Sequence, residues 1–596
     1  MDTSVGHPKS NGRDRHVADA SKAGLTSGPR PPHKPPASHY RRPTQNAFVA
    51  SERAATTILF IGLTWKHGRL IQASLEGLGY KCQQLPDPDR AAFQIGKEYG
   101  NPGQCNPTYF STGCLIQFLQ GLERDGLSRE QIAQRYVFIT AGACGPCRFG
   151  MYEAEFRLAL TNAGFADMRV ILFQQHGLNQ AGEEAGLHVN ADFVMALIMS
   201  FALADLINDI SYQIRPYEVN DGETDAALAT SIDELAAVIK DLAHRQAARS
   251  VRKSRLPMTG TVHLLARLVY WFRAAALTDA LEQIRHRFGD IEIDRTRPRP
   301  IVKTTGEFWA QTTEGDGNYG LLGFLEREGA EVVAEPVGAW LPFSVHQARV
   351  KARDRLMLSS GSLRQQLSQR WRRLRSFLLL VAVDGLYMAQ WRRLRRILGD
   401  MPRLLPDQLL LRELADPFYN YRSGGGEGHL EVGKNIYYHS HRLCHMVLSI
   451  KPFGCLPSTQ SDGAQSAVTS HYPEMVFLPI ETSGEGEINA HSRVQMALGD
   501  VRQRARDELD HVLNWSGVTL PEVEAFVQYN PVMRCASYRV PKSDRLVSVA
   551  ANFVAHVAYL MDRVQIPAPL DRPAVRPSGV SASTPTPLLQ IEGAAG

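Results

Sequence analysis

The chain has 596 residues, of which 44% are hydrophobic and 21% are charged, so it has enough apolar material for a large globular core. Its formal net charge is +5 at pH 7, but the first 50 residues alone hold eight Lys or Arg against three Asp. The rest of the chain is neutral overall, and this balance gives no indication of nucleic-acid binding.

Cysteine content and apolar runs indicate the compartment. No segment has the pattern of a secretory signal, and the longest apolar runs, residues 193–204 and 377–383, are shorter than the roughly 20 residues that cross a bilayer. We therefore expect a cytoplasmic protein without a membrane span. Eight cysteines are too few for a disulfide scaffold in a chain of this length, so we expect metal ligation or redox chemistry from them.

Both ends of the chain are predicted to be disordered. Residues 1–51 form a basic tail with seven prolines and few large apolar side chains, so they cannot bury enough surface to offset the entropy of ordering. The Pro-rich end, residues 566–596, has the same character.

Strands and helices alternate after the first tail. Apolar runs at 57–63, 136–141 and 168–173 predict strands, and helical periodicity follows the first two. This alternation is typical of a parallel α/β sheet. We assign residues 52–255 to a first α/β lobe and residues 256–295 to a helical connector. Long helices are expected at 193–210, 224–245 and 260–288.

The alternation begins again near residue 296. A strand is predicted within residues 299–309, followed by a helix and a second strand, and further strands are predicted at 446–450 and 475–481. We assign residues 296–565 to a second α/β lobe.

A basic helical insertion interrupts the second lobe at residues 363–396. It holds nine arginines against the single acid Asp384, and the sequence Trp-Arg-Arg-Leu-Arg occurs in it twice, 20 residues apart. Two interpretations stay open: a solvated, salt-bridged helical hairpin, or a docking surface for an anionic partner or the phosphates of CoA.

Four cysteines lie on loops rich in Gly and Pro. Cys105 precedes an amphipathic helix, Cys144 and Cys147 follow the strand at 136–141, and Cys455 follows the strand at 446–450. Loops after parallel strands gather at one edge of a sheet, where ligands bind, so these cysteines are expected to converge between the lobes.

The setting of the four cysteines favours two kinds of metal centre. Free backbone amides in such loops can hydrogen-bond cluster sulfides, and a helix N-terminus favours a thiolate. Soft thiolates without nearby histidines indicate either an iron–sulfur cluster or an all-cysteine zinc site. The other cysteines, and two further motifs, are expected to be structural: Cys82, Cys114, Cys444, Cys535, the histidines of 439–445 and the Gly-rich run 428–435.

Several motifs resemble those of a known family. They are GQCNPTYF at 103–110, CGPCRFGMYEAEF at 144–156, KPFGCLPS at 451–458 and LPIETSGEGEINAHSRVQM at 478–496. They resemble the 2-hydroxyacyl-CoA dehydratase D-component superfamily, in the branch of acyl-CoA dehydratase activase-related proteins. The opening of the second lobe, residues 301–336, is also similar to that family.

The resemblance implies a fold, a cofactor and partners. The fold would be two Rossmann-like lobes with a 4Fe-4S cluster between them, held by Cys105, by Cys144 or Cys147, and by Cys455. The function would be transfer of low-potential electrons in acyl-CoA chemistry, as a 2-hydroxyglutaryl-CoA dehydratase-like component or its electron-transfer partner. An ATP-dependent activase or another low-potential donor, and an acyl-CoA thioester, would be the partners.

This sequence departs from the dehydratase subunits because it has both Cys144 and Cys147. Three thiolates leave one iron of a four-iron cluster open to substrate, whereas four thiolates close the cluster and favour electron transfer. We expect all four cysteines to be ligands. The alternative in another class is a binding or scaffold protein stabilised by zinc on the same four residues.

Overall fold

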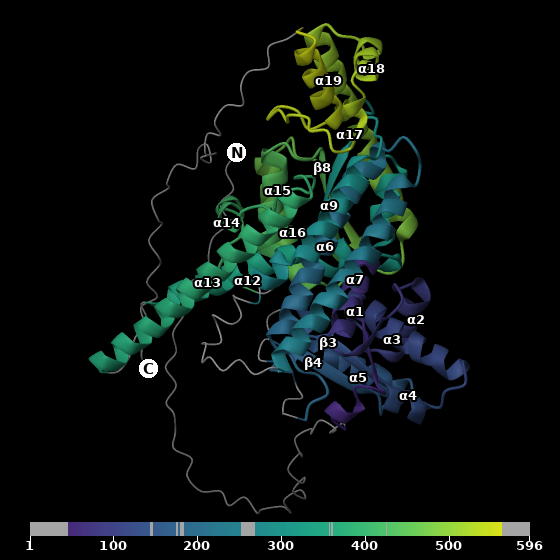
Figure 1. The fold of residues 1–596 in the computed structure, drawn as a ribbon, viewed down its shortest axis with the longest axis vertical. Coiled ribbons are helices and arrows are strands. Elements are labelled where there is room, and N and C mark those ends of the chain that lie inside the picture. The colour runs from purple at the N-terminus through teal and green to yellow at the C-terminus, as the bar shows by residue number, and fades with distance from the viewer. Residues whose placement is uncertain are drawn as a thin grey trace, which may run out of the picture. The chain divides into compact units, whose positions relative to one another are not determined.

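The computed structural model describes residues 46–562 except 143–146, 175–176, 179–183, 252–266, 268, 357, 359–361 and 425. Cys144, most of the predicted first tail and the predicted tail at 566–596 lie outside the described residues. The described chain is an α/β structure with two sheets, and each sheet contains four parallel strands (Figure 1).

The first sheet has the strand order β2-β1-β3-β4-β5. Its first four strands are parallel, and the short β5 is antiparallel to β4. Buried Ile58, Leu59 and Phe60 place the apolar run of β1 inside the lobe. The strands are β1 (Thr57–Phe60), β2 (Lys81–Gln84), β3 (Tyr136–Ala141), β4 (Arg169–Gln174) and β5 (Gly177–Leu178).

Side-chain caps fix the starts of several helices in this lobe. Thr64 accepts the His67 amide at the start of α1, and Asp89 accepts the Ala92 amide at the start of α2. Ser128 and Gln131 form a capping box on α4. The helices are α1 (Trp65–Gly77), α2 (Arg90–Tyr99), α3 (Asn106–Arg124), α4 (Arg129–Arg135) and α5 (Tyr152–Asn162).

The second sheet has the order β7-β6-β8-β9 and all its pairings are parallel. Gly306 ends β6 with a φ of +119°, and a Cβ there would lie 2.0 Å from the carbonyl oxygen of Ile450, so only glycine fits this position. The strands are β6 (Ile301–Gly306), β7 (Glu331–Val333), β8 (Met446–Pro452) and β9 (Phe477–Thr482).

Ten helices accompany the second sheet among the described residues. They are α10 (Phe308–Thr312), α11 (Leu321–Arg327), α12 (Trp340–Leu356), α13 (Leu363–Ile397), α14 (Gln408–Ala415), α15 (Gly428–Ser440), α16 (Leu456–His471), α17 (Glu487–Ser516), α18 (Leu520–Tyr529) and α19 (Val549–Leu560). The C-terminal α18 and α19 pack with the end of α17 in a separate apolar cluster.

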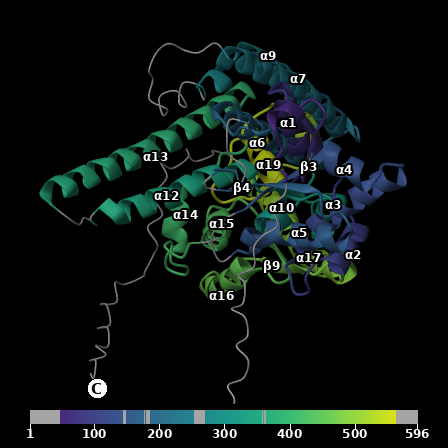
Figure 2. The same cartoon turned by 90° about the horizontal axis from the view of Figure 1, so that it is seen from below.

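A helical layer joins the two sheets. It consists of α6 (Ala191–Ile214), α7 (Glu223–Val251) and α9 (Ala275–Gly289), which share an apolar core with α1 and with the C-terminal part of α13 (Figure 2). Trp271 and Trp391 are among the largest buried side chains of this core. The predicted connector, residues 256–295, is therefore part of the core where it is described.

The apolar run at 193–204 belongs to a longer helical segment than the sequence suggested. Among the described residues, Ala191–Tyr217 is the one helical stretch long and apolar enough to cross a membrane by length and composition. Most of its apolar window, 72%, is buried inside the protein. Packing in the shared core accounts for its apolar character.

The predicted boundary of the first tail is wrong by several residues. Phe48 is 1% exposed and packs against β1, and Val49 pairs with Ala185 in an antiparallel bridge. Glu52 forms an ion pair with Arg169 at 2.8 Å. Residues 46–51 therefore belong to the first lobe, because an apolar anchor is present at Phe48.

The Arg-rich insertion is one continuous helix. The 35 residues of α13 run from Leu363 to Ile397, and the helix packs against α12 instead of folding back on itself. Both copies of the Trp-Arg-Arg-Leu-Arg sequence lie on this helix, where Trp371 is exposed and Trp391 is buried. The hairpin in this region is formed by α12 and α13.

Candidate functional site

The two lobes contact each other through the start of α3 in the first lobe and the carboxyl ends of β8 and β9 in the second. The Asn106 side chain, at the start of α3, donates to the carbonyl oxygen of Thr482 at the end of β9 at 2.5 Å. A Cβ on Gly454, after β8, would lie 3.6 Å from the Cα of Cys105. These contacts place the cysteine loop of the second lobe against the first cysteine loop of the first lobe.

Cys105 caps the N-terminus of α3 with extended backbone, and Pro107 follows inside the first turn. Its thiol is buried, with the sulfur 3.2 Å from Thr108 Oγ1 and 3.3 Å from Tyr152 Oη. Burial is the main cause that raises the pKa of the Tyr152 phenol well above its usual value, and the nearby Cys105 adds to the shift. Tyr152 is therefore a neutral neighbour of this sulfur.

Cys147 lies at the start of a short 3-10 turn, and its sulfur accepts the Phe149 amide at 3.5 Å. The next residue, Arg148, reaches the loop before Cys105 and donates to the carbonyl oxygen of Gly103. The guanidinium thus ties the two cysteine loops of the first lobe together. The acceptor of this hydrogen bond is a backbone carbonyl and not a cysteine sulfur.

Cys455 caps the N-terminus of α16 in the same way that Cys105 caps α3. Its backbone is extended, Pro457 follows in the first turn, and its thiol is buried. Gly454 before it has a φ of +77°, which allows the sharp bend between β8 and the helix. Both cysteines are therefore buried N-cap residues with a proline in the first turn, although Cys455 follows strand β8 and Cys105 follows helix α2.

Two carboxylates that the sequence analysis missed lie beside these thiols. Glu307 follows β6 and its Oε2 accepts the Ala310 amide at 2.9 Å, while Glu427 precedes α15 and its Oε1 accepts the Phe308 amide at 3.0 Å. They are 120 positions apart in the chain, so no local spacing could have paired them. The signal available was the position of Glu307 directly after a strand.

The carboxylates and burial set the protonation of the site. Burial raises the pKa of Glu307 to about 6, and burial together with the charge of Glu307 raises the pKa of Glu427 to about 8. Burial also raises the pKa of the Cys147 thiol to about 12, and the charges of both glutamates add to this upward shift. Burial, together with the charge of Glu307, also raises the pKa of the Cys455 thiol above its usual value. These cysteines are therefore thiols until a cation compensates their charge.

The donor chemistry at this site fits thiolate ligation. Three buried or half-buried sulfurs, from Cys105, Cys147 and Cys455, lie on loops that contact each other or share the same carboxylate neighbours. Within the described residues, however, no set of three or more His, Cys, Asp and Glu side chains is arranged to hold a metal ion. The fourth predicted ligand, Cys144, lies outside the described residues.

The remaining cysteines occupy structural positions. Cys82, Cys114 and Cys444 are buried, and the Cys114 thiol donates to the carbonyl oxygen of Pro86 at 3.1 Å. Cys535 differs, because it is half-buried. Cys114 is useful for comparison, because it shares helix α3 with Cys105.

Two motifs with possible ligand functions have structural roles in the fold. The Gly-rich run 428–435 forms the first turns of α15, with buried Glu431 bonded to Ser449 and Ser461 and buried Lys434 paired with Glu335. It is a helix and not a phosphate-binding loop. In the histidine-rich segment, His445 accepts the Ile301 amide at 2.8 Å and thereby supports β6.

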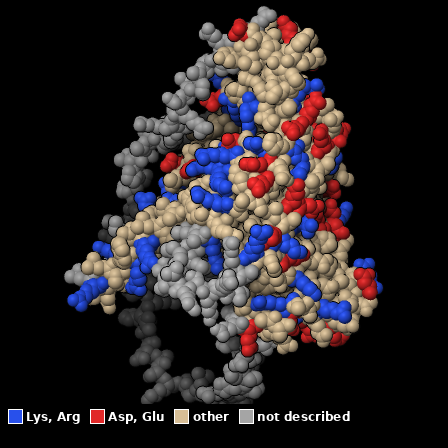
Figure 3. Space-filling view, in the orientation of Figure 1, with Lys and Arg blue, Asp and Glu red and all other residues tan. Residues whose placement is uncertain are grey.

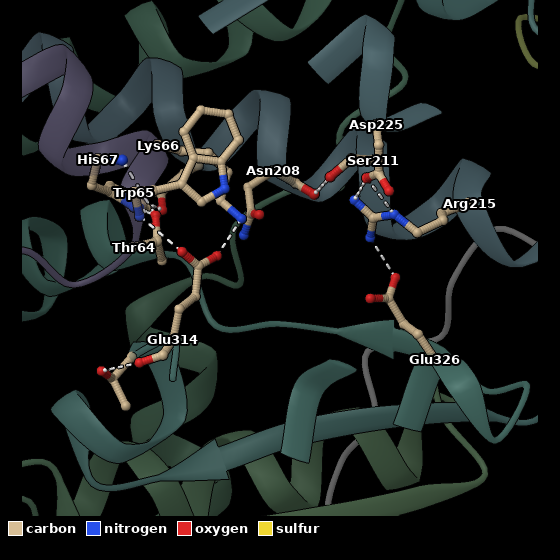
Figure 4. Close-up of polar contacts among 12 residues, drawn as sticks. Thr64, Trp65, Lys66, His67, Asn208, Ser211, Arg215, Asp225, Glu314 and Glu326 are labelled. Carbon is tan, nitrogen blue, oxygen red and sulfur yellow. Dashed lines mark hydrogen bonds and ion pairs between the residues drawn. The ribbon is translucent and has the colours of Figure 1, made fainter. Parts of the chain in front are cut away.

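A cavity of about 720 Å³ lies away from the cysteines, between α1, the end of α6 and the loop before α11. Glu314 accepts the Trp65 amide at 2.8 Å and pairs with Lys66, while Arg215 pairs with Asp225 at 2.8 Å and with Glu326 at 2.6 Å (Figure 4). These charges neutralise one another, so the cavity presents no strong preference for an anion or a cation. No cysteine lines it.

Comparisons with known proteins do not assign the chain to a group: no family model matches the sequence, and no curated protein matches it.

Proposed function

We propose that the protein is an iron–sulfur protein whose cluster is bound between the two lobes by Cys105, Cys147, Cys455 and Cys144. The observation that carries this proposal is that Cys105 and Cys455 are each buried at the N-cap of a helix, on loops in contact across the lobes. The motifs around them, which resemble those of the dehydratase superfamily, support the same assignment.

The residues around the thiols have defined tasks under this proposal. The N-termini of α3 and α16 stabilise thiolate charge at Cys105 and Cys455. Tyr152 Oη offers a hydrogen bond to the Cys105 sulfur, and such bonds to ligand sulfurs tune cluster potential. Glu307, whose pKa is raised to about 6, takes up a proton as negative charge is added nearby, whereas Glu427, whose pKa is raised to about 8, is already protonated at neutral pH. When bound, the cluster supplies a low-potential electron.

The chemistry we propose is acyl-CoA reduction chemistry in the cytoplasm, with an ATP-dependent activase or another low-potential donor as partner. This part rests on the resemblance of the motifs. Whether the chain is a dehydratase-like component or an electron carrier depends on the number of thiolate ligands, because four thiolates leave no iron open to substrate.

Serine substitutions test the ligand set. Cys105→Ser, Cys147→Ser, Cys144→Ser and Cys455→Ser are each expected to lose most of the iron and the visible absorption of protein purified without oxygen. Cys114→Ser is the matched control, because Cys114 is buried in the same helix as Cys105 but bonds to Pro86, and it is expected to keep the iron. Measuring iron, zinc and acid-labile sulfide together distinguishes the proposed cluster from a zinc site.

Two results would contradict the proposal. One is a colourless protein with stoichiometric zinc, which would favour the scaffold function. The other is equal iron retention in the Cys105→Ser and Cys114→Ser variants. Loss of iron in the Cys147→Ser variant but not in the Cys144→Ser variant would reduce the set to three thiolates and favour an open iron.

A further inference from the structure

Helix α13 has an exposed row of large apolar side chains. Leu367 and Trp371 are 65% and 67% exposed, Leu378 is 55% exposed, and Leu374 and Val381 are 38% and 37% exposed. We call these five residues the outer seam. Single exposed apolar residues are common on protein surfaces, but five in one row on one helix indicate a contact surface.

The spacing within the outer seam is that of a coiled coil. Its members follow one another at intervals of four, three, four and three residues, which are the a and d positions of a heptad repeat. At 100° per residue they span roughly 80° of the helix circumference. Such a stripe is narrower than the apolar face of a helix that packs into a globular core or lies in a membrane interface.

The other side of α13 is already occupied by α12. Asp384 of α13 pairs with Arg349 of α12 at 2.7 Å, and Arg373 donates to the Arg355 carbonyl oxygen at 2.8 Å. Figures 1 and 2 both show the two helices side by side, with the N-terminal part of α13 lying beyond the layer formed by α6, α7 and α9. The outer seam is therefore available while the hairpin is held in place.

The surroundings of the outer seam are strongly basic. Residues 340–381, which we call the basic hairpin, contain nine Lys or Arg and one acid, Asp354, which pairs with Arg422 at 3.0 Å. Arg370 and Arg375 occupy the g and e positions that border the seam, and Arg364 extends the row at its N-terminal end. Figure 3 shows Lys and Arg atoms along this part of α13.

The charge and shape of the outer seam indicate which kind of partner binds it. Two copies of the chain paired through their outer seams would bring arginines at e and g positions close together, which is unfavourable. An amphipathic helix whose own apolar seam is bordered by Asp or Glu would bury the five apolar residues and neutralise the arginines. We infer that the outer seam is a docking site for an acidic amphipathic helix of a partner protein. This inference is independent of the proposed cluster.

A designed peptide provides the probe. It is an amphipathic helix of about four heptads with Leu at a and d and Glu at e and g, and its binding to the full chain is followed by fluorescence anisotropy. A second peptide carries Lys in place of every Glu. The full chain is expected to bind the Glu peptide, to bind it less tightly as salt increases, and to bind the Lys peptide at least about tenfold more weakly.

Two sets of variants separate the seam from its charges. Trp371→Ser with Leu378→Ser is expected to weaken binding of the Glu peptide about tenfold or more, since two exposed anchors are lost. Met496→Ser, at a residue of α17 that is 69% exposed, is the matched control and should bind normally. Arg364→Glu, Arg370→Glu and Arg375→Glu together should reverse the preference toward the Lys peptide. Circular dichroism checks that each variant keeps its helix content.

Three outcomes would overturn the inference. The first is equal binding of the Glu peptide by the seam variant and the control. The second is no binding of the peptide combined with tight binding to vesicles of anionic lipid that the seam variant loses, which would assign the surface to a membrane. The third is concentration-dependent self-association in sedimentation that the seam variant abolishes, which would assign it to a second copy.

Discussion

Two buried imidazole rings make the stability of the second lobe sensitive to acid. His346 on α12 and His429 on α15 are each 6% exposed. Burial lowers the pKa of His346 to about 4, and Arg412 and Arg349 contribute. Burial likewise lowers the pKa of His429 to about 4. Both rings are therefore neutral in the folded protein at physiological pH.

The sign of the pH effect follows from these directions. An unfolded histidine titrates near pH 6.5, so between about pH 6.5 and about pH 4 the unfolded chain binds more protons than the folded chain. The stability that the two neutral, buried rings allow is fully present above about pH 6.5 and is lost as the pH falls toward 4. Acidification therefore lowers the free energy of unfolding by roughly 1–3 kcal/mol per ring, and replacing both residues by Leu is expected to remove this loss.

Urea unfolding of the wild-type chain and of the His346→Leu, His429→Leu variant at about pH 7.5 and about pH 5 measures this difference. His511, an exposed histidine of α17, supplies the control through His511→Leu, which should leave the pH dependence unchanged. The account of these rings is wrong if the double variant loses as much stability on acidification as the wild-type chain does.

At the scale of elements, a short N-terminal segment packs onto the first lobe. Ala50 donates to the Glu184 carbonyl oxygen at 2.9 Å, and Phe48 is buried against the sheet. Phe48→Ala is expected to lower the free energy of unfolding by about 3–5 kcal/mol, as for other buried Phe to Ala changes. Deleting residues 1–45, whose composition offers no apolar anchor, should leave the midpoint of thermal unfolding nearly unchanged.

Scanning calorimetry of the two variants distinguishes anchor from tail. If deletion of residues 1–45 lowers the melting midpoint as much as Phe48→Ala does, the tail has contacts that its composition does not indicate. If Phe48→Ala has no effect, burial of Phe48 contributes nothing to the lobe.

The elements that the sequence predicted well are those with a complete local signal. The apolar, β-branched run Tyr136–Ala141 was predicted as a strand with the bounds that β3 has. The strand β2, Lys81–Gln84, was missed because only Cys82 in it is buried and pairing with β1 determines its conformation. Helix α13 was predicted as basic and helical, but its packing partner α12 could not be inferred, because the charge pattern of α13 does not specify which helix covers it.

The residues of the candidate site also divide into those that a local sequence signal predicts and those that depend on packing. The loops with Cys147 and Cys455 could be found from residue types and their position after strands, and the Cys105 loop could be found from its Gly and Pro residues before a helix. Glu307 and Glu427 could not, because their proximity arises from the packing of α10 against the start of α15. The raised pKa values of the Cys147 and Cys455 thiols also depend on this packing, and a helix N-terminus alone would have suggested the opposite shift.

At the scale of the whole molecule, buried polar contacts hold the two lobes in register around the site. Asp205 of α6 accepts His67 of the first lobe at 3.0 Å and the backbone amides of Val337 and Gly338 in the second lobe at 2.8 and 2.6 Å. The Asn106 contact with Thr482 adds a tie beside Cys105. A cofactor bound by thiolates from both lobes would be sheltered by this arrangement and would strengthen it.

The central claim is that a redox-active iron–sulfur cluster binds at the cysteine loops between the lobes. Electron paramagnetic resonance of protein purified without oxygen and reduced with dithionite, combined with its iron content, tests it most directly. We predict about four irons per chain and a signal of a reduced four-iron cluster that Cys105→Ser or Cys455→Ser abolishes and Cys114→Ser preserves. A protein without iron that gives no signal and holds zinc would contradict the claim.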